Sequence, residues 1–176
     1  MTCPKHVKED ILAEKKTVNA EEAVKTENDI AGGWVLNYHA RLGEYKDMCA
    51  QFAVLAATES DGMPHGTGTS NPCANKAVTL ADINEHRDWL EVVELAERTL
   101  SEQKRMFINF RRLAIEINFK KEVGRPGWVD YVSAKYCEWH CRRYGVACLP
   151  ARVTMMEWWS TIANVAARIA IRKGLI

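Results

Sequence analysis

Residues 137–148 concentrate the side chains whose types suit metal or nucleophile chemistry. Cys137, His140 and Cys141 lie three and four residues apart, a spacing that places them on one surface of a helix. Thiolates and imidazole are suitable zinc ligands, and Cys148 is a candidate fourth ligand. However, the spacing is not one of the usual C-x2-C zinc frameworks, and free cysteine is commonly a small buried apolar residue. We therefore expect core packing, with no metal or other cofactor, and keep zinc as the alternative.

The same segment contains a cysteine and histidine pair that would suit nucleophilic catalysis, with Cys137 or Cys141 activated by His140. Residues this close on one helix seldom also shape a substrate pocket, and no third orienting group or oxyanion loop is evident. The glycine-rich segment 59–75 lacks the Gly-Lys-Ser/Thr ending and the preceding buried strand of a phosphate-binding loop. We therefore expect a protein that is not an enzyme.

Positive charge is concentrated toward the carboxyl end, although the whole chain has a formal net charge of only +1. Residues 1–103 hold 10 basic and 18 acidic side chains, a net of −8, whereas residues 104–176 hold 14 basic and 5 acidic ones, a net of +9. Lysine and arginine set against phosphates release condensed counterions, which favours binding to polyanions. We expect double-stranded DNA as the partner. The alternative is an acidic half that packs against the basic half of the same molecule.

The elements that must position these residues are predicted to be helices. Strong helix breakers are few in the 176 residues, 47% of which are apolar, so the predicted class is all-α. Residues 1–31 have sparse apolar positions, which predicts a mobile or loosely helical arm. Residues 32–123 are predicted to form an N-terminal helical domain with an ordered loop at 59–75. From Val78 onward the apolar spacing predicts two tandem helices, with a capping box at Thr99–Glu102.

Residues 124–176 are predicted to form a basic helix-turn-helix unit. Arg125-Pro126-Gly127 stops the preceding helix, and the next helix is expected to end at a left-handed cap on Gly145. A second helix is expected to carry Pro150 in its first turn and to end at Gly174. Its predicted buried stripe consists of Val153, Met156, Trp159, Ile162, Val165 or Ala166, and Ile169. In the helix-turn-helix motif, the second helix lies in the DNA major groove.

The residues of this unit that face solvent are the candidate DNA contacts. Cations on the first helix are expected to contact phosphates, and residues near the start of the second helix are expected to reach base edges. The phosphate contacts would be Lys135, Arg142 and Arg143, with Arg125 just before the first helix. The base contacts would be Arg152, Thr154 and Met155. A solvated basic face without a ligand is the alternative.

Five segments of the chain resemble a known family. They are NYHARLGEYKDM, DGMPHGTGTSNPCANKAVTLADI, WLEVVELAERTLSEQKRMF, RPGWVDYVSAKYC and VAARIAIRKGLI. These segments are similar to phage late transcriptional activators of the RinA and ArpU type, and the most specific matches are Ser70-Asn71-Pro72 and Asn75-Lys76-Ala77. The resemblance implies a C-terminal unit similar to sigma-factor region four. It also implies sequence-specific binding to bacteriophage promoters and activation of packaging and assembly genes.

Two other functions remain open at this point. One is a small DNA-recognition subunit of a phage packaging terminase, because helical, basic proteins of similar size serve there. The other is a zinc-stabilised or protein-binding helical assembly module. Homodimerisation is a secondary expectation, because DNA sites of this kind often have dyad symmetry. One of the adjacent Trp158 and Trp159 is expected either to contact a partner such as RNA polymerase or to lie partly buried under a neighbouring helix.

The sequence also predicts the compartment. No apolar stretch is long enough for a membrane span, and the N-terminus lacks the apolar core of a signal peptide. We therefore expect a cytoplasmic protein of the bacterial host cell, without a membrane partner. Its six cysteines are expected to be reduced thiols.

Overall fold

The computed structural model describes residues 22–58, 72–118 and 127–176, and all the regular secondary structure in these ranges is helical. A first helix covers residues 22–36 and leads through a bend at Asn37 into α2 (Tyr38–Thr58). The other helices are α3 (Pro72–Thr99), α4 (Glu102–Asn118), α5 (Trp128–Tyr144) and α6 (Arg152–Lys173). The predicted all-α class is confirmed for the described part of the chain.

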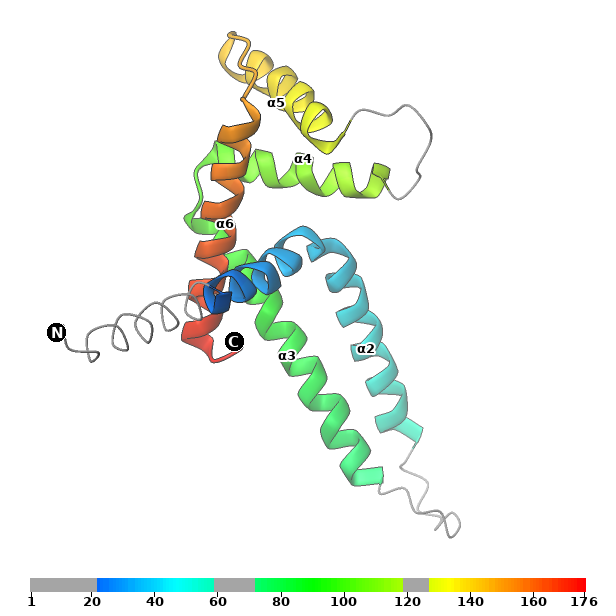
Figure 1. Ribbon diagram of the computed structural model, residues 1–176. Helices are drawn as coiled ribbons and strands as arrows, with labels where there is room; N and C mark the ends of the chain where they lie inside the picture. Colours follow the sequence, from blue (N-terminus) through cyan, green and yellow to red (C-terminus); the bar gives the residue numbers. More distant parts are fainter. Residues whose placement is uncertain (1–21, 59–71, 119–126) are drawn as a thin grey trace, which may run out of the picture.

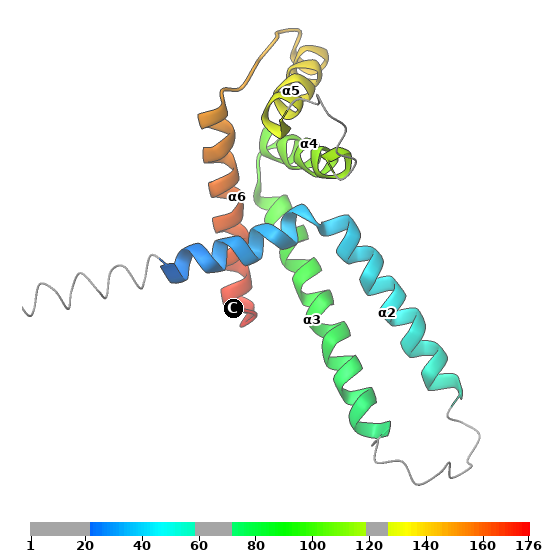
Figure 2. The same ribbon diagram turned by 45° about the vertical axis from the view of Figure 1, so that its right-hand side comes forward.

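The helices form a long hairpin at one end and a smaller group at the other. Figure 1 shows α2 and α3 extending together away from the rest of the molecule, with α4 and α5 at the opposite end. The first helix crosses α6 near the base of the hairpin, as Figures 1 and 2 both show. The packed pairs are α2 with α3, α4 with α5, and α6 with both α3 and α4. Helix α6 therefore connects the two ends of the molecule.

A single hydrophobic cluster joins the helices at this crossing. Its buried members include Val35 of the first helix, Val92 and Val93 of α3, Phe107 and Ile108 of α4, Val132 of α5, and Ile162 and Ala166 of α6. The predicted boundary between residues 32–123 and 124–176 therefore does not separate two cores. Helices α5 and α6 complete the core that α3 and α4 begin, because all four helices contribute buried apolar side chains to this cluster.

The expected arm and loop differ from the described structure at their edges. Residues 22–31 are helical, which the prediction of a mobile or loosely helical arm allowed, but Ala31 at the end of this range is fully buried. The physical reason is that Ala31 and Val35 belong to the hydrophobic cluster. Helix α3 already begins at Pro72, at the end of the predicted loop, and proline is favoured in the first turn of a helix. Residues 1–21 and 59–71 lie outside the described residues.

The break between the two tandem helices is confirmed, but the capping residue is not the expected one. The Thr99 hydroxyl donates to the carbonyl of Ala96, inside α3, at 2.8 Å. The hydroxyl of Ser101 accepts from the backbone N–H of Lys104 at 3.5 Å, which is the contact of an N-cap residue. Ser101 is therefore the N-cap residue of α4, and the chain turns at Leu100–Ser101.

The ends of the last two helices agree with the expected glycine caps. Gly145 and Gly174 both have φ of 72°, the left-handed conformation that glycine adopts without steric cost. Pro150, in contrast, precedes α6, whose N-cap is Ala151, so its expected place in the first turn is wrong. Residues 145–151 connect the two helices, about twice the three or four residues of a helix-turn-helix turn. The connection is therefore longer than the predicted motif requires.

A buried arginine of α4 contacts three other helical elements. Arg112 of α4 is only 5% exposed. Its Nε donates to the carbonyl of Val35 at 2.8 Å, and its Nη2 donates to Glu97 Oε1 of α3 at 2.6 Å. The guanidinium also lies 5.1 Å from the ring centroid of Tyr38. Its charge is thus compensated by groups from the first helix, α2 and α3.

Replacing Arg112 by alanine is expected to lower the free energy of unfolding by about 3–5 kcal/mol, because it leaves the Glu97 carboxylate without its cation in a partly buried position. The measurement is urea unfolding followed by circular dichroism. The matched control is Arg98→Ala, which removes an exposed pair with Glu94 at 3.9 Å and should cost less than about 1 kcal/mol. Equal losses of stability in the two variants would contradict this role of Arg112.

The adjacent glycines Gly32 and Gly33 of the first helix differ in the space around them, so substitutions at the two positions can be compared. A Cβ at Gly32 would lie 2.9 Å from Trp159 Cζ2, whereas a Cβ at Gly33 would meet no atom within 4 Å. We expect Gly32→Ala to lower the unfolding free energy by about 1–3 kcal/mol through overpacking. Gly33→Ala should raise it by up to about 1 kcal/mol through helix propensity. Thermal unfolding of both variants tests this, and a Gly32→Ala protein as stable as Gly33→Ala would refute the close approach.

Candidate nucleic-acid interface

The candidate interface lies where α5 ends and α6 begins, a region that we call the α5–α6 tip (residues 142–156). Three hydrogen bonds hold its connecting segment. The N–H of Gly145 donates to the Cys141 carbonyl at 2.9 Å, and His140 Nδ1 lies 2.7 Å from the Val146 carbonyl. Ser133 Oγ donates to the Pro150 carbonyl at 3.3 Å. The segment is therefore fixed to α5 at both of its ends.

The tip rests on a cluster of aromatic side chains from three helices. The rings of Tyr136 and Trp158 lie 5.3 Å apart, and those of Phe107 and Trp158 lie 5.7 Å apart. Tyr136 also contacts Trp139, at 5.3 Å between ring centroids. Burial raises the pKa of Tyr136 to about 12, with smaller contributions from Cys148 and Tyr144. These contacts position α5 and the start of α6 against α4.

Two of the predicted cations are exposed at the tip. Arg142 lies in the last turn of α5 and Arg152 is the first residue of α6, and the side chains of both are open to solvent. Residue Arg143 is also exposed, but its Nε lies 3.4 Å from Glu102 Oε1 of α4. The structure thus brings three arginines of the predicted site to one end of the molecule.

Of the other two predicted cations, the one that the structure describes lies apart from this group. Lys135 lies further back along α5 and its Nζ donates to Glu138 Oε2 at 3.0 Å. Arg125 lies outside the described residues. The carboxylates of Glu102 and Glu138 therefore partly neutralise two of the expected phosphate contacts, Arg143 and Lys135. Exposed ion pairs of this kind contribute only about 0–1 kcal/mol, so a phosphate can replace either carboxylate at low cost.

The rotation of α6 about its axis differs from the prediction. Met155 is fully buried in the hydrophobic cluster, so its predicted contact with a base edge is wrong. Val153 and Met156, two residues of the predicted buried stripe, are instead 68% and 45% exposed. Thr154 is half-buried between these two faces. The residues that the first two turns of α6 present to solvent are therefore Arg152, Val153, Met156 and the acidic Glu157.

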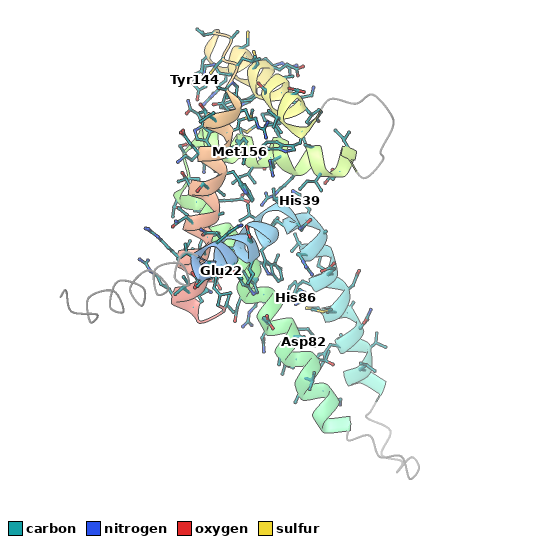
Figure 3. The ribbon with its side chains drawn as sticks, in the orientation of Figure 1. Glu22, His39, Asp82, His86, Tyr144 and Met156 are labelled. Carbon is teal, nitrogen blue, oxygen red and sulfur yellow. The ribbon has the colours of Figure 1, made fainter. Side chains whose placement is uncertain are left out.

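The tip also exposes large apolar side chains, most of which the sequence does not predict to be exposed. Figure 3 shows Tyr144 at the end of α5 and Met156 on α6. The large apolar residues exposed here are Tyr144, Val146, Leu149, Val153 and Met156. Val146 and Leu149 lie in a segment without helical spacing, so no periodic signal marks them. Large exposed apolar groups gathered in one region are typical of interaction surfaces.

The two tryptophans at 158 and 159 are both partly buried by neighbouring helices. Trp158 belongs to the aromatic cluster, and Trp159 lies against Gly32 and the guanidinium of Arg111. Burial under a neighbouring helix, one of the two expected outcomes, is thus the one that the structure has.

The cysteine and histidine residues of α5 and the tip do not gather into a metal site. Cys137, Cys141 and Cys148 are free thiols, and His140 Nδ1 is engaged by the Val146 carbonyl. Among the described residues, no three His, Cys, Asp or Glu side chains are close enough together to hold a metal ion. The zinc-stabilised alternative therefore lacks a ligand set in this part of the chain.

Comparisons with known proteins assign no family. No protein-family model, curated protein or solved structure matches the chain. The resemblance to RinA and ArpU activators thus remains a prediction. In the three described ranges, no helix has both the length and the apolar character needed to cross a bilayer.

The raised pKa of Tyr136 predicts how stability changes at alkaline pH. The folded protein holds this phenol neutral to about pH 12, whereas the unfolded chain ionises it near the ordinary value of 10.0. Its contribution to stability is therefore complete below pH 10.0 and is lost as the pH rises through about 12. We expect Tyr136→Phe to show a shallower fall in melting temperature over this range than the natural protein. Identical falls in the two proteins would contradict the assignment.

Proposed function

We propose that this protein binds double-stranded DNA through the α5–α6 tip. The observation that carries the proposal is the exposure of Arg142, Arg143 and Arg152 at one end of a C-terminal region with a net charge of +9. The first turns of α6 extend from this end with their outer face open to solvent. A helix start flanked by arginines has the elements of a major-groove contact: cations for phosphates and a protruding helix for base edges.

The positions of the side chains suggest a division of roles. Arg142 and Arg143 contact phosphates, and Arg143 exchanges its Glu102 partner for the DNA backbone. Arg152, Val153 and Met156 reach base edges, where arginine reads guanine and the apolar side chains contact thymine methyl groups. In this proposal Val153 and Met156 take the place of Met155. No step in this function requires a catalytic residue.

The resemblance to phage late activators supports a more specific role. We propose that the DNA is a phage promoter and that the protein activates packaging and assembly genes, with RNA polymerase and a second copy of the chain as partners. A small DNA-recognition subunit of a packaging terminase would bind DNA in the same way. A promoter-driven transcription assay separates these roles, because only the activator raises transcript levels.

DNA binding should depend on salt through the tip arginines. The test is fluorescence anisotropy of a labelled duplex longer than two helical turns, over a series of salt concentrations. The natural protein should lose affinity steeply as salt rises, and Arg142→Ala/Arg143→Ala should flatten the logarithmic slope by about 0.9 for each phosphate that is no longer neutralised. Arg98→Ala, an exposed arginine of α3, is the control and should keep the natural slope. Binding that ignores salt, or equal slopes in all three proteins, would rule out this interface.

A protein-binding assembly module is the second candidate function. The observation that favours it is the exposure of Val146 and Leu149, at 62% and 71%, beside the arginines. If the tip binds protein rather than DNA, the natural chain should show no affinity for duplex in the same assay. It should instead self-associate in light scattering, and Val146→Ser/Leu149→Ser should abolish this association.

A further inference from the structure

A cavity of about 400 Å³ lies between the first helix, α4 and α6. Its size falls within the range of roughly 300–1,000 Å³ that is usual for small-molecule sites. The polar side chains that line it are Asn28, Asp29, Arg111 and Ser160, and Leu36 and Trp159 supply apolar walls. None of these residues belongs to the α5–α6 tip, so the cavity is separate from the proposed DNA interface.

Arg111 is the cation that lines this cavity, and no described residue forms an ion pair with it. Its guanidinium carbon lies 3.6 Å from the ring centroid of Trp128 and 5.1 Å from that of Trp159. Its buried Nη1 has no hydrogen-bond partner, and no carboxylate of the described residues forms an ion pair with it. Burial lowers the pKa of Arg111, which reflects the cost of removing this charge from water. The two indole rings hold the guanidinium in place without supplying an anion.

The adjacent Arg112, which is more deeply buried than the half-buried Arg111, has its charge paired within the chain. Arg112 has a carboxylate at 2.6 Å and a carbonyl at 2.8 Å. Arg111, one residue away on the same helix, has aromatic rings in place of both. A carboxylate or similar anion is the partner that a guanidinium binds most strongly. Because no carboxylate of the described residues pairs with Arg111, a bound anion would supply the partner that this guanidinium lacks in the described part of the chain.

The remaining walls restrict the kind of anion. Asp29 lines the same cavity, so it repels a dianion and accepts a hydrogen bond from an N–H or O–H group. Trp159 and Leu36 favour a ligand with an apolar body. Gly33 leaves one side of the cavity open, because a Cβ there would meet no atom within 4 Å. The walls thus suit a monoanion with an apolar body and a hydrogen-bond donor.

We propose that this cavity binds a small organic carboxylate, with the carboxylate on Arg111, the apolar body against Trp159 and a donor group on Asp29. The proposal is independent of DNA binding.

The test is isothermal titration calorimetry of the full chain with 4-hydroxybenzoate as the probe. We expect a dissociation constant of about 1 mM or tighter. Two comparison compounds separate the parts of the ligand: 4-hydroxybenzyl alcohol lacks the charge, and inorganic phosphate lacks the apolar body. Both should bind at least tenfold more weakly. No binding of 4-hydroxybenzoate up to about 10 mM, or equal binding of the neutral alcohol, would overturn the proposal.

Two variants assign the binding to this cavity. Arg111→Gln removes the cation and should weaken binding at least tenfold, with folding checked by circular dichroism. Gly33→Leu keeps Arg111 and places a side chain in the open part of the cavity, so it should abolish binding even if Arg111→Gln does not fold. Gly43→Leu is the matched control, because its Cβ also meets no atom within 4 Å but lies on α2, away from the cavity. Natural affinity in Gly33→Leu would refute the site.

Discussion

The buried cation of Arg112 fixes how the helices are arranged. A guanidinium removed from water loses its hydrogen bonds to water, and oxygen atoms of the protein must replace them. Glu97 and the carbonyl of Val35 supply these oxygens at 2.6 and 2.8 Å. Because the two acceptors belong to different elements, both can be reached only when α3, α4 and the first helix hold one relative placement. The bend at Asn37 follows Val35 closely, so the direction of α2 is set from the same point.

Two consecutive arginines of α4 meet different environments because successive residues of a helix point in different directions. Arg112 faces the first helix and α3, where an acid and a carbonyl are available. Arg111 faces Trp128 of α5 and Trp159 of α6, where aromatic rings are available. One charge thus joins helices through ionic hydrogen bonds, and the other borders a cavity. Arg112 is therefore held by an acid and a carbonyl of the protein, whereas Arg111 is held by aromatic rings beside the cavity.

The core and the candidate interface are physically connected through α6. The same helix that contributes Ile162 and Ala166 to the core presents Arg152 to solvent at its first turn. Because Tyr136 and Trp158 pack together, the rotation of α6 determines which of its early residues face outward. The tip is therefore an extension of the single core rather than a separate domain.

Local sequence is enough to specify the helical class, the tandem helices after Val78 and the glycine caps at 145 and 174, because these features depend on residue spacing and backbone preference. It also places Arg142, Arg143 and Arg152 near one connection. The burial of Met155 and the exposure of Val153 and Met156, in contrast, emerge only when the helices pack. Both faces of this part of α6 are apolar at helical spacing, so local pattern cannot choose between them. Contact with helices distant in sequence makes that choice, and contacts of the same kind distinguish Arg111 from Arg112.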